Sequence, residues 1–268
     1  MNLSRMALGL SYSGQQYEGW QSQLSGQTVQ DHLEKALANF AQTPLKTLCA
    51  GRTDSGVHAL LQVVHFDTPV QRELSSWVRG TNRYLPSDVA VQWAREVPKE
   101  FHARACARSR RYSYLLLQSP VRPSIEYERV GWVAKPLDLS AMRQAAQLLL
   151  GTHDFTSFRA SQCQALSPIK TISHLEISQK SAHAEHAYFR FDFEANAFLH
   201  HMIRNIMGCL VQVGLGEQGP QWIKEVIEAR DRKQAAPTFS AQGLYFLGPS
   251  YDPQWGLPIG SPSYDWIL

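Results

Sequence analysis

The residues best suited to chemistry lie in one ten-residue stretch, Ala50 to Ala59, which reads Ala-Gly-Arg-Thr-Asp-Ser-Gly-Val-His-Ala. An acid, Asp54, stands between two glycines, and a base, Arg52, stands two residues before it. Glycine allows sharp turns and close approach to a ligand, and short polar residues favour turns. The stretch therefore predicts an active-site loop that presents the Asp54 carboxylate at the tip of a turn. An ordinary turn or helix cap has the same composition.

Other reaction chemistries lack their usual motifs in this sequence. There is neither a dinucleotide-binding fingerprint nor a P-loop. We expect no metal site, because the cysteines form no C-x-x-C pair and no histidine is suitably spaced. The cysteines, expected to be reduced and mostly buried, are Cys49, Cys106, Cys163 and Cys209. The histidines expected to have structural roles are His58, His65, His200 and His201.

The composition is that of a globular protein with a sizeable core. The chain has 268 residues, of which 44% are hydrophobic and 18% charged, and its formal net charge is +3. This length suits one large domain or two ordinary ones, and we favour two halves. The N-terminus leads directly into a strand pattern without the apolar run of a signal peptide, and no window reaches membrane-spanning length. We therefore expect a cytoplasmic protein with no membrane partner.

A basic segment offers a candidate surface for phosphates. Between His102 and Arg111 there are four arginines and no acid. Such a run is usually a solvated face. It becomes a nucleic-acid footprint only where neighbouring residues suit that role, and Tyr112, which follows directly, offers a ring for a base.

Strands on both sides must position the Asp54 loop. Alternating or apolar residues predict strands at 47–50 and 61–66, and rigid strands hold a loop in place. Before them, 6–12 has the pattern of a half-buried strand, 16–23 that of a polar loop, and Thr28 is the expected N-cap of a helix that continues to Phe40. Further expected helices span 76–84, 140–150 with Gly151 as the stop, 199–213 and 220–230. Further expected strands span 89–97, 111–117, 172–179, 188–194 and 244–247, and 153–159 is expected to be a loop.

These elements do not follow the strict strand-helix-strand rhythm of a parallel sheet. We therefore expect the α+β class, with a mainly antiparallel central sheet flanked by helices. The expected organisation is an N-terminal αβ half at 1–105 that carries the Asp54 loop, a C-terminal αβ half at 106–248, and an irregular tail at 249–268.

The stretch from Gly51 to Ala59 closely resembles the active-site motif of the TruA-type tRNA pseudouridine synthases. Six further blocks resemble that family in its order: 62–66, 101–104, 110–114, 153–155, 198–205 and 243–245. The departures are mild, since Ser55 stands where alanine is frequent and Gly80-Thr81-Asn82 is an unusual lead into the following turn. The resemblance implies a pseudouridine synthase-like fold and an isomerase that converts uridine to pseudouridine at positions 38, 39 and 40 of the tRNA anticodon stem-loop. It also implies a reaction without a cofactor, and a homodimer that binds tRNA.

The same resemblance implies three catalytic residues. Asp54 would be the nucleophile or the base at C2', and the sequence does not choose between these roles. Arg204 would keep that carboxylate charged, although helical spacing alone favours an arginine at the edge of an apolar helix. Tyr112 would stack on the uracil and assist proton removal, although a tyrosine within a strand is more often core. The three roles follow from the match to the family's motif blocks and not from the residue types alone.

Four arginines are expected to contact the RNA. Arg52 would contact a phosphate or fill the gap left by the departing base; otherwise it is a loop arginine in a weak surface ion pair. Contacts to the RNA backbone, which recognise shape and not base identity, are expected from Arg104, Arg108 and Arg110.

Two rival functions fit parts of the sequence. Asp54-Ser55-Gly56 resembles the triplet of an aspartic hydrolase, but that chemistry needs two carboxylates that share a proton, and the neighbouring arginines and long helices oppose it. A non-catalytic RNA-binding module would explain the basic segment and its aromatic residues. It would not explain the conjunction of Asp54, Tyr112 and Arg204.

Overall fold

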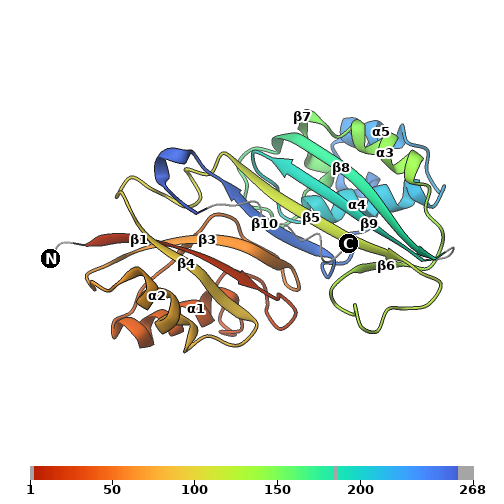
Figure 1. Ribbon diagram of the computed structural model, residues 1–268. Coiled ribbons are helices and arrows are strands. Elements are labelled where there is room, and N and C mark those ends of the chain that lie inside the picture. The colour runs from red at the N-terminus through yellow and green to blue at the C-terminus, as the bar shows by residue number, and fades with distance from the viewer. Residues whose placement is uncertain (1–2, 184–185, 259–268) are drawn as a thin grey trace. The chain divides into compact units, whose positions relative to one another are not determined.

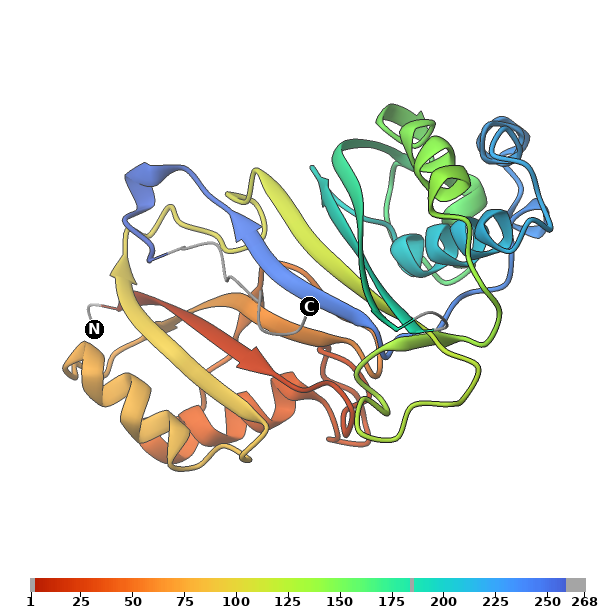
Figure 2. The same cartoon turned by 45° about the vertical axis from the view of Figure 1, so that its right-hand side comes forward.

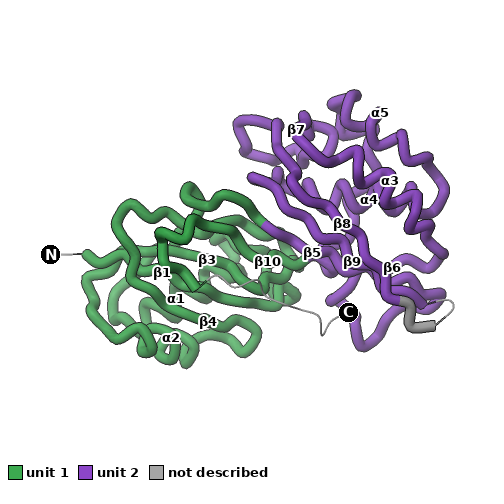
Figure 3. The backbone as a smooth tube through the Cα atoms, turned by 45° about the horizontal axis from the view of Figure 1, so that its top comes forward, with its two compact units in different colours: residues 1–110, 245–263 green, residues 111–244, 264–268 purple. Residues whose placement is uncertain are grey.

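The structure is a computed structural model that describes residues 3–183 and 186–258. The chain forms two compact units (Figure 3). Within the described ranges, unit 1 holds residues 3–110 and 245–258, and unit 2 holds the residues between 111 and 244. The sequence predicts a break between residues 105 and 106 and a second half that continues to residue 248. The boundary in the structure follows Arg110, and the chain returns to unit 1 at Tyr245.

Unit 1 is built on strands in the order β4-β1-β3-β10 (Figure 1). β1 (Ser4–Tyr12) pairs antiparallel with both β3 (His58–Thr68) and β4 (Val89–Val97). The short β2 (Leu48–Cys49) pairs antiparallel with β3, and β10 (Leu244–Ser250) pairs parallel with it. The prediction of a half-buried β1 is wrong, because all residues from Met6 to Leu10 are buried. Both faces of this strand are therefore covered.

Two helices pack side by side in unit 1. α1 (Val29–Ala41) begins where predicted, because the Thr28 side chain accepts a hydrogen bond from the backbone N–H of Asp31. This is the usual N-cap arrangement. α2 (Leu74–Asn82) contacts β4 and places Trp77, which is 1% exposed, against Phe66 and Phe40.

Unit 2 has strands in the order β5-β9-β8-β7. β5 spans Ser109–Gln118, and the short β6 (Gly131–Val133) pairs parallel with it. β8 (Ile169–His183) pairs antiparallel with β9 (His186–Ala195) and with β7 (Gly151–Asp154). Three phenylalanines of β9 share one face and are fully buried, as their spacing predicts: Phe189, Phe191 and Phe193.

Three helices lie on one side of β8 and β9 (Figure 2). They are α3 (Leu139–Gln147), α4 (Met202–Gly214) and α5 (Trp222–Ala229). α4 is the most buried, and α3 packs against it. The prediction of an α+β fold with mainly antiparallel strands is confirmed.

Two predicted helix ends are wrong for local reasons. The fourth helix begins at Met202 and not at residue 199, because His201 adopts a left-handed conformation with φ 62° that an α-helix cannot continue. The third helix ends at Gln147, although Leu149 is fully buried, and Gly151 opens β7 with φ 93°. The apolar residue that follows Gln147 at helical spacing is therefore buried in a turn and not in the helix.

Three further predictions need correction. The expected loop at 153–159 contains the end of β7 and a 3-10 turn at Thr156–Phe158, and Asp154 accepts from the N–H of Thr156, the first residue of that turn, over 3.0 Å. The expected irregular tail begins inside β10 and continues into a 3-10 turn at Pro253–Trp255 that packs on Phe101; its residues 259–268 lie outside the described part. Only Cys209 of the four thiols is buried, and the others are half-buried.

Candidate active site

Asp54 lies in the loop that joins β2 to β3 in unit 1. The loop begins at Ala50, whose N–H donates to the Val63 carbonyl over 2.8 Å. It closes in a turn in which the Val57 N–H donates to the Asp54 carbonyl over 3.2 Å. Gly56 occupies the turn with φ 78°, a conformation that favours glycine. Asp54 is half-buried and is the first residue of this turn. The sequence predicts Asp54 at the tip of the turn, whereas in the structure the tip follows Asp54.

The residues on both sides of Asp54 are held by the end of β1 and the segment that follows it. The Tyr12 hydroxyl lies 2.7 Å from Thr53 Oγ1, and the Trp20 N–H donates to the Thr53 carbonyl over 3.0 Å. The Ser55 hydroxyl donates to the Tyr17 carbonyl over 3.1 Å. Thr53 and Ser55 therefore both have fixed positions, which restricts the backbone from which the Asp54 carboxylate extends.

A glycine allows this close contact. Gly19 has φ 89°, and a Cβ atom there would lie 2.7 Å from the Thr53 carbonyl oxygen. A side chain at this position would thus both strain the backbone and push the Asp54 loop away. Trp20, which follows, is 1% exposed and anchors the segment in the core of unit 1.

The end of the loop is fixed through His58 on β3. Its Nδ1 accepts from the Gly14 N–H over 3.2 Å. Its ring stacks on that of Tyr245 from β10, with centroids 4.6 Å apart and planes 18° apart. A Cβ atom on Gly14 would lie 2.1 Å from the Val57 carbonyl, so the chain passes the loop with no room for a side chain. The expectation of a structural role for His58 agrees with these contacts.

The start of the loop is held by Gln62 and Arg110. The Gln62 Nε2 donates to the Gly51 carbonyl over 2.6 Å, and Gln62 is fully buried. The Arg110 guanidinium donates to three backbone carbonyls, those of Ala50 at 3.3 Å, Arg104 at 2.6 Å and Ala107 at 3.2 Å. Arg110 therefore links the basic segment to the loop that carries Asp54.

The other predicted RNA-contacting arginines have different surroundings. Arg52 and Arg104 are exposed. The turn that carries Arg104 is capped by His102, whose Nδ1 accepts from the N–H groups of Arg104 and Ala105 over 3.1 and 3.2 Å. Arg108 forms an ion pair with Asp252 in the segment after β10. Arg52, Arg104 and Arg108 are thus all exposed, whereas Arg110 is half-buried.

His65, on β3, contacts the backbone and a side chain of the basic segment. Its Nδ1 accepts from the Ala103 N–H over 3.2 Å, and its ring lies 4.6 Å from that of His102. Burial, followed by the positive charges of His102 and Arg5, lowers the pKa of His65 to about 4. His65 is therefore neutral at physiological pH, and its Nδ1 stays an acceptor.

Tyr112 and Arg204 belong to unit 2. Tyr112 lies on β5, is 8% exposed and packs edge-to-face on Phe198, with ring centroids 5.2 Å apart. Arg204 lies on α4 and is half-buried, at the edge of the buried stripe as the helical spacing predicts. Its Nε donates to the Phe239 carbonyl over 2.9 Å, and its own carbonyl accepts from the Phe239 N–H over 3.1 Å. Arg204 therefore also fixes the segment that precedes β10.

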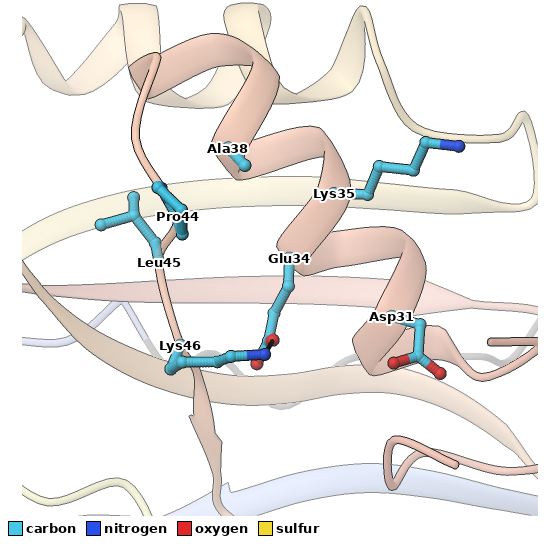
Figure 4. A pocket seen from close by; sticks show the side chains of 7 residues that line it. All are labelled: Asp31, Glu34, Lys35, Ala38, Pro44, Leu45 and Lys46. Carbon is cyan, nitrogen blue, oxygen red and sulfur yellow. Dashed lines mark hydrogen bonds and ion pairs between the residues drawn. The ribbon is translucent and has the colours of Figure 1, made fainter. Parts of the chain in front are cut away.

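A shallow hollow beside α1 serves structure. Figure 4 shows its lining residues, Asp31, Glu34, Lys35, Ala38, Pro44, Leu45 and Lys46. Glu34 accepts from the Lys46 ammonium over 2.8 Å, from the Thr47 N–H over 2.9 Å and from Gln30 over 2.9 Å. The carboxylate is thus fully used in fastening α1 to the chain that leads into β2 and the Asp54 loop.

Sequence reasoning missed the residues that hold the Asp54 loop. The sequence pattern predicts Tyr12 only as a strand residue, and the segment with Tyr17 and Trp20 only as a polar loop. The available signal was the pair of glycines, Gly14 and Gly19, on either side of an aromatic residue. For Gln62, the signal was an amide among apolar residues of a buried strand.

Within residues 3–183 and 186–258, every helix is too short or too polar to cross a membrane. A family model described as tRNA pseudouridine synthase matches residues 10–104 and 145–252. The chain belongs to the tRNA pseudouridine synthase family. The prediction of an isomerase that acts on tRNA uridine is thereby confirmed.

Curated relatives are similar to this synthase over nearly the whole chain. "tRNA pseudouridine synthase A" of Polaromonas naphthalenivorans (strain CJ2) is 66% identical over 263 residues, which cover 98% of this chain and 99% of the relative. The protein of the same name in Delftia acidovorans (strain DSM 14801 / SPH-1) is 60% identical over 280 residues, with coverage of 98% and 99%.

Among solved structures, similarity is distant. One match is a chain of the "Crystal Structure of a Cbf5-Nop10-Gar1 Complex", which is 10% identical with a TM-score of 0.37 and covers 90% of this chain and 48% of that one. The family assignment rests on the sequence relatives.

Proposed function

We propose that the protein converts uridine to pseudouridine at positions 38, 39 and 40 in the anticodon stem-loop of tRNA. In this isomerisation the bond from C1' of the ribose to N1 of the base breaks, and a bond from C1' to C5 forms. The C5 hydrogen leaves as a proton, and N1 regains one. The reaction is redox-neutral, and every step is a bond exchange or a proton transfer.

The proposal rests above all on the fixed loop around Asp54. Hydrogen bonds hold both Thr53 and Ser55, and a pre-organised carboxylate is what nucleophilic or general-base catalysis requires. We propose that the Asp54 carboxylate is the catalytic group, acting either as the nucleophile or as the base at C2'.

Two residues of unit 2 complete the proposed catalytic set. We propose that Arg204 keeps the Asp54 carboxylate charged when the substrate excludes water, because a desolvated charge needs a partner. We propose that the Tyr112 ring stacks on the uracil and that its hydroxyl assists removal of the C5 proton. Stacking of a base on an aromatic ring contributes about 1–3 kcal/mol, which offsets much of the cost of extruding the nucleotide.

Three of the proposed RNA-contacting arginines are exposed, namely Arg52, Arg104 and Arg108. They would bind phosphates directly, Arg108 in place of its ion pair with Asp252. Arg110 already donates to backbone carbonyls, so it would act mainly through its charge. Such contacts position the RNA without reading its sequence.

We further propose a homodimer in the cytoplasm. The four cysteines are free thiols, which suits a reducing compartment. Sedimentation equilibrium at micromolar concentration tests the dimer: a mass twice that of the chain is expected, and a single-chain mass would contradict it.

The test of the function is tritium release from tRNA that carries C5-tritiated uridine. The transcripts would hold uridine at only one of positions 38, 39 and 40, or cytidine at all three. We expect release from each single-uridine transcript and none from the triple-cytidine control. Equal release from the control would place the target elsewhere in the tRNA, and no release from any transcript would favour a binding module.

A further inference from the structure

A cluster of buried polar groups lies beneath the Asp54 loop. It consists of Tyr12 from β1, Thr53 from the loop and Gln62 from β3, which are 4%, 7% and 0% exposed. Polar groups are seldom buried unless they are hydrogen-bonded, because their desolvation is costly. The core neighbours of Gln62 on its strand, Leu61 and Val63, are apolar, so the amide at this position requires an explanation.

Every polar atom of the Gln62 carboxamide has a partner. Nε2 donates to the Gly51 carbonyl over 2.6 Å, and Oε1 accepts from the Val63 N–H over 3.2 Å. The side chain also lies close enough to the Tyr12 hydroxyl to act on the pKa of that group. A glutamine amide has two donors, so one group can serve both the loop backbone and the tyrosine.

The Tyr12 hydroxyl in turn contacts Thr53, the residue before Asp54, and lies 2.7 Å from Thr53 Oγ1. A register shift in the pairing of β1 with β3 occurs between Leu10 and Tyr12, and such irregularities re-aim a side chain. Burial raises the pKa of the Tyr12 hydroxyl well above its usual range. It therefore stays protonated and keeps both its donor and its acceptor capacity.

We propose that Gln62 is a positioning residue for catalysis, which fixes Asp54 by holding Gly51 directly and Thr53 through the Tyr12 hydroxyl. Gly51 and Thr53 are the two loop positions on either side of Arg52, and Thr53 is bonded to Asp54. Loss of the amide would free the Gly51 carbonyl and loosen the Tyr12 hydroxyl that contacts Thr53. The inference rests on the proposed catalytic role of Asp54 and deepens it, because it names what sets the place of the carboxylate.

The main test is Gln62→Leu, which removes the amide at nearly constant volume. Steady-state kinetics with tRNA, tRNA affinity and Tm would be measured together. We expect kcat to fall at least about ten-fold, because small misplacements of a catalytic group are costly, while KM and tRNA affinity change less than about two-fold. Gln118→Leu is the matched control, since Gln118 is 9% exposed on β5 and accepts from the Leu137 N–H over 2.9 Å. It should lower Tm with little change in kcat.

A second variant guards against a failure of Gln62→Leu to fold. Tyr12→Phe removes only the hydroxyl and should lower kcat at unchanged KM. The double variant should be no slower than Gln62→Leu, because both changes break one chain of contacts. A kcat within two-fold of wild type in a folded Tyr12→Phe or Gln62→Leu protein would overturn the proposal, and so would a rise in KM at constant kcat. If the wild type itself releases no tritium from tRNA, the proposed function fails instead.

Discussion

The Arg110 guanidinium donates to the Ala50 carbonyl oxygen over 3.3 Å, so a residue of the basic segment holds the start of the loop that carries Asp54. The basic segment thus has two kinds of arginine. Arg110 bonds backbone carbonyls, whereas Arg104 and Arg108 are exposed. Charge density alone does not separate these roles, but the hydrogen bonds do.

Substitution of the exposed arginines should weaken tRNA binding most. We expect Arg52→Gln and Arg104→Gln each to raise Kd and to reduce the slope of log Kd against log salt by about one. Arg110→Gln should change this slope less and lower kcat more, because it releases Ala50. Filter binding over a salt series is the measurement, with Arg79→Gln on α2 as an exposed control.

Equal salt slopes for Arg104→Gln and Arg79→Gln would contradict a phosphate contact at Arg104. An unchanged kcat in Arg110→Gln would contradict its role in holding the loop.

Removal of the Tyr112 hydroxyl should slow turnover while tRNA binding is kept. The ring of Tyr112→Phe can still stack and can still pack on Phe198. We expect kcat to fall at least about ten-fold, as for loss of a general acid or base, with affinity near that of the wild type. A large loss of affinity would show instead that the hydroxyl holds the substrate.

Variants of Arg204 should separate its charge from its contact with Phe239. Arg204→Gln removes the charge and should lower kcat about 100-fold, the usual effect of losing an electrostatic contact in a reaction centre. Arg204→Lys keeps the charge and should retain more activity. Arg143→Gln is the control, because Arg143 donates to the Ile177 carbonyl over 3.0 and 2.8 Å within the same unit.

A catalytic charge at Arg204 and a purely structural role predict different changes in kcat and Tm. If kcat fell equally in Arg204→Lys and Arg204→Gln, and only in proportion to the fall in Tm, the residue would serve structure alone.

Stability should fall on acidification because of His65. Its pKa is about 4 in the folded chain against an ordinary value of 6.5, so the unfolded chain binds the proton more tightly. The stabilising contribution is present above pH 6.5 and is lost as the pH falls towards 4; it amounts to at most about 3 kcal/mol. Urea unfolding from pH 7.5 to 4.5 should show a flatter profile for His65→Asn than for wild type. His174→Gln, at an exposed histidine, should leave the profile unchanged, and an equally steep profile in His65→Asn would contradict this account.

Local patterns predicted the elements that depend on near neighbours. Thr28 caps α1 through Asp31, three residues away, and the strand at 89–97 has the bounds that its pattern indicates. The alternation of Phe189 to Phe193 likewise gave the buried face of β9. In each case the stabilising contacts follow directly from residue spacing.

Contacts between distant segments were not predictable in this way. Nothing in the sequence near Gln62 points to the Gly51 carbonyl, and nothing near Arg108 points to Asp252. The left-handed backbone of His201 depends equally on its surroundings. The candidate catalytic residues came from family resemblance, because residue type alone left an ordinary turn as an equal reading of Asp54.

The most direct test of the catalytic role of Asp54 is tritium release by Asp54→Asn, measured beside tRNA affinity. We predict that release falls at least about a thousand-fold, as for loss of a nucleophile, while Kd stays within about two-fold of wild type. Ser55→Ala, which keeps the carboxylate and loses one of the bonds that hold the loop, that to the Tyr17 carbonyl, should lower release far less than Asp54→Asn. Release by Asp54→Asn at a substantial fraction of the wild-type rate would show that Asp54 is not the catalytic carboxylate.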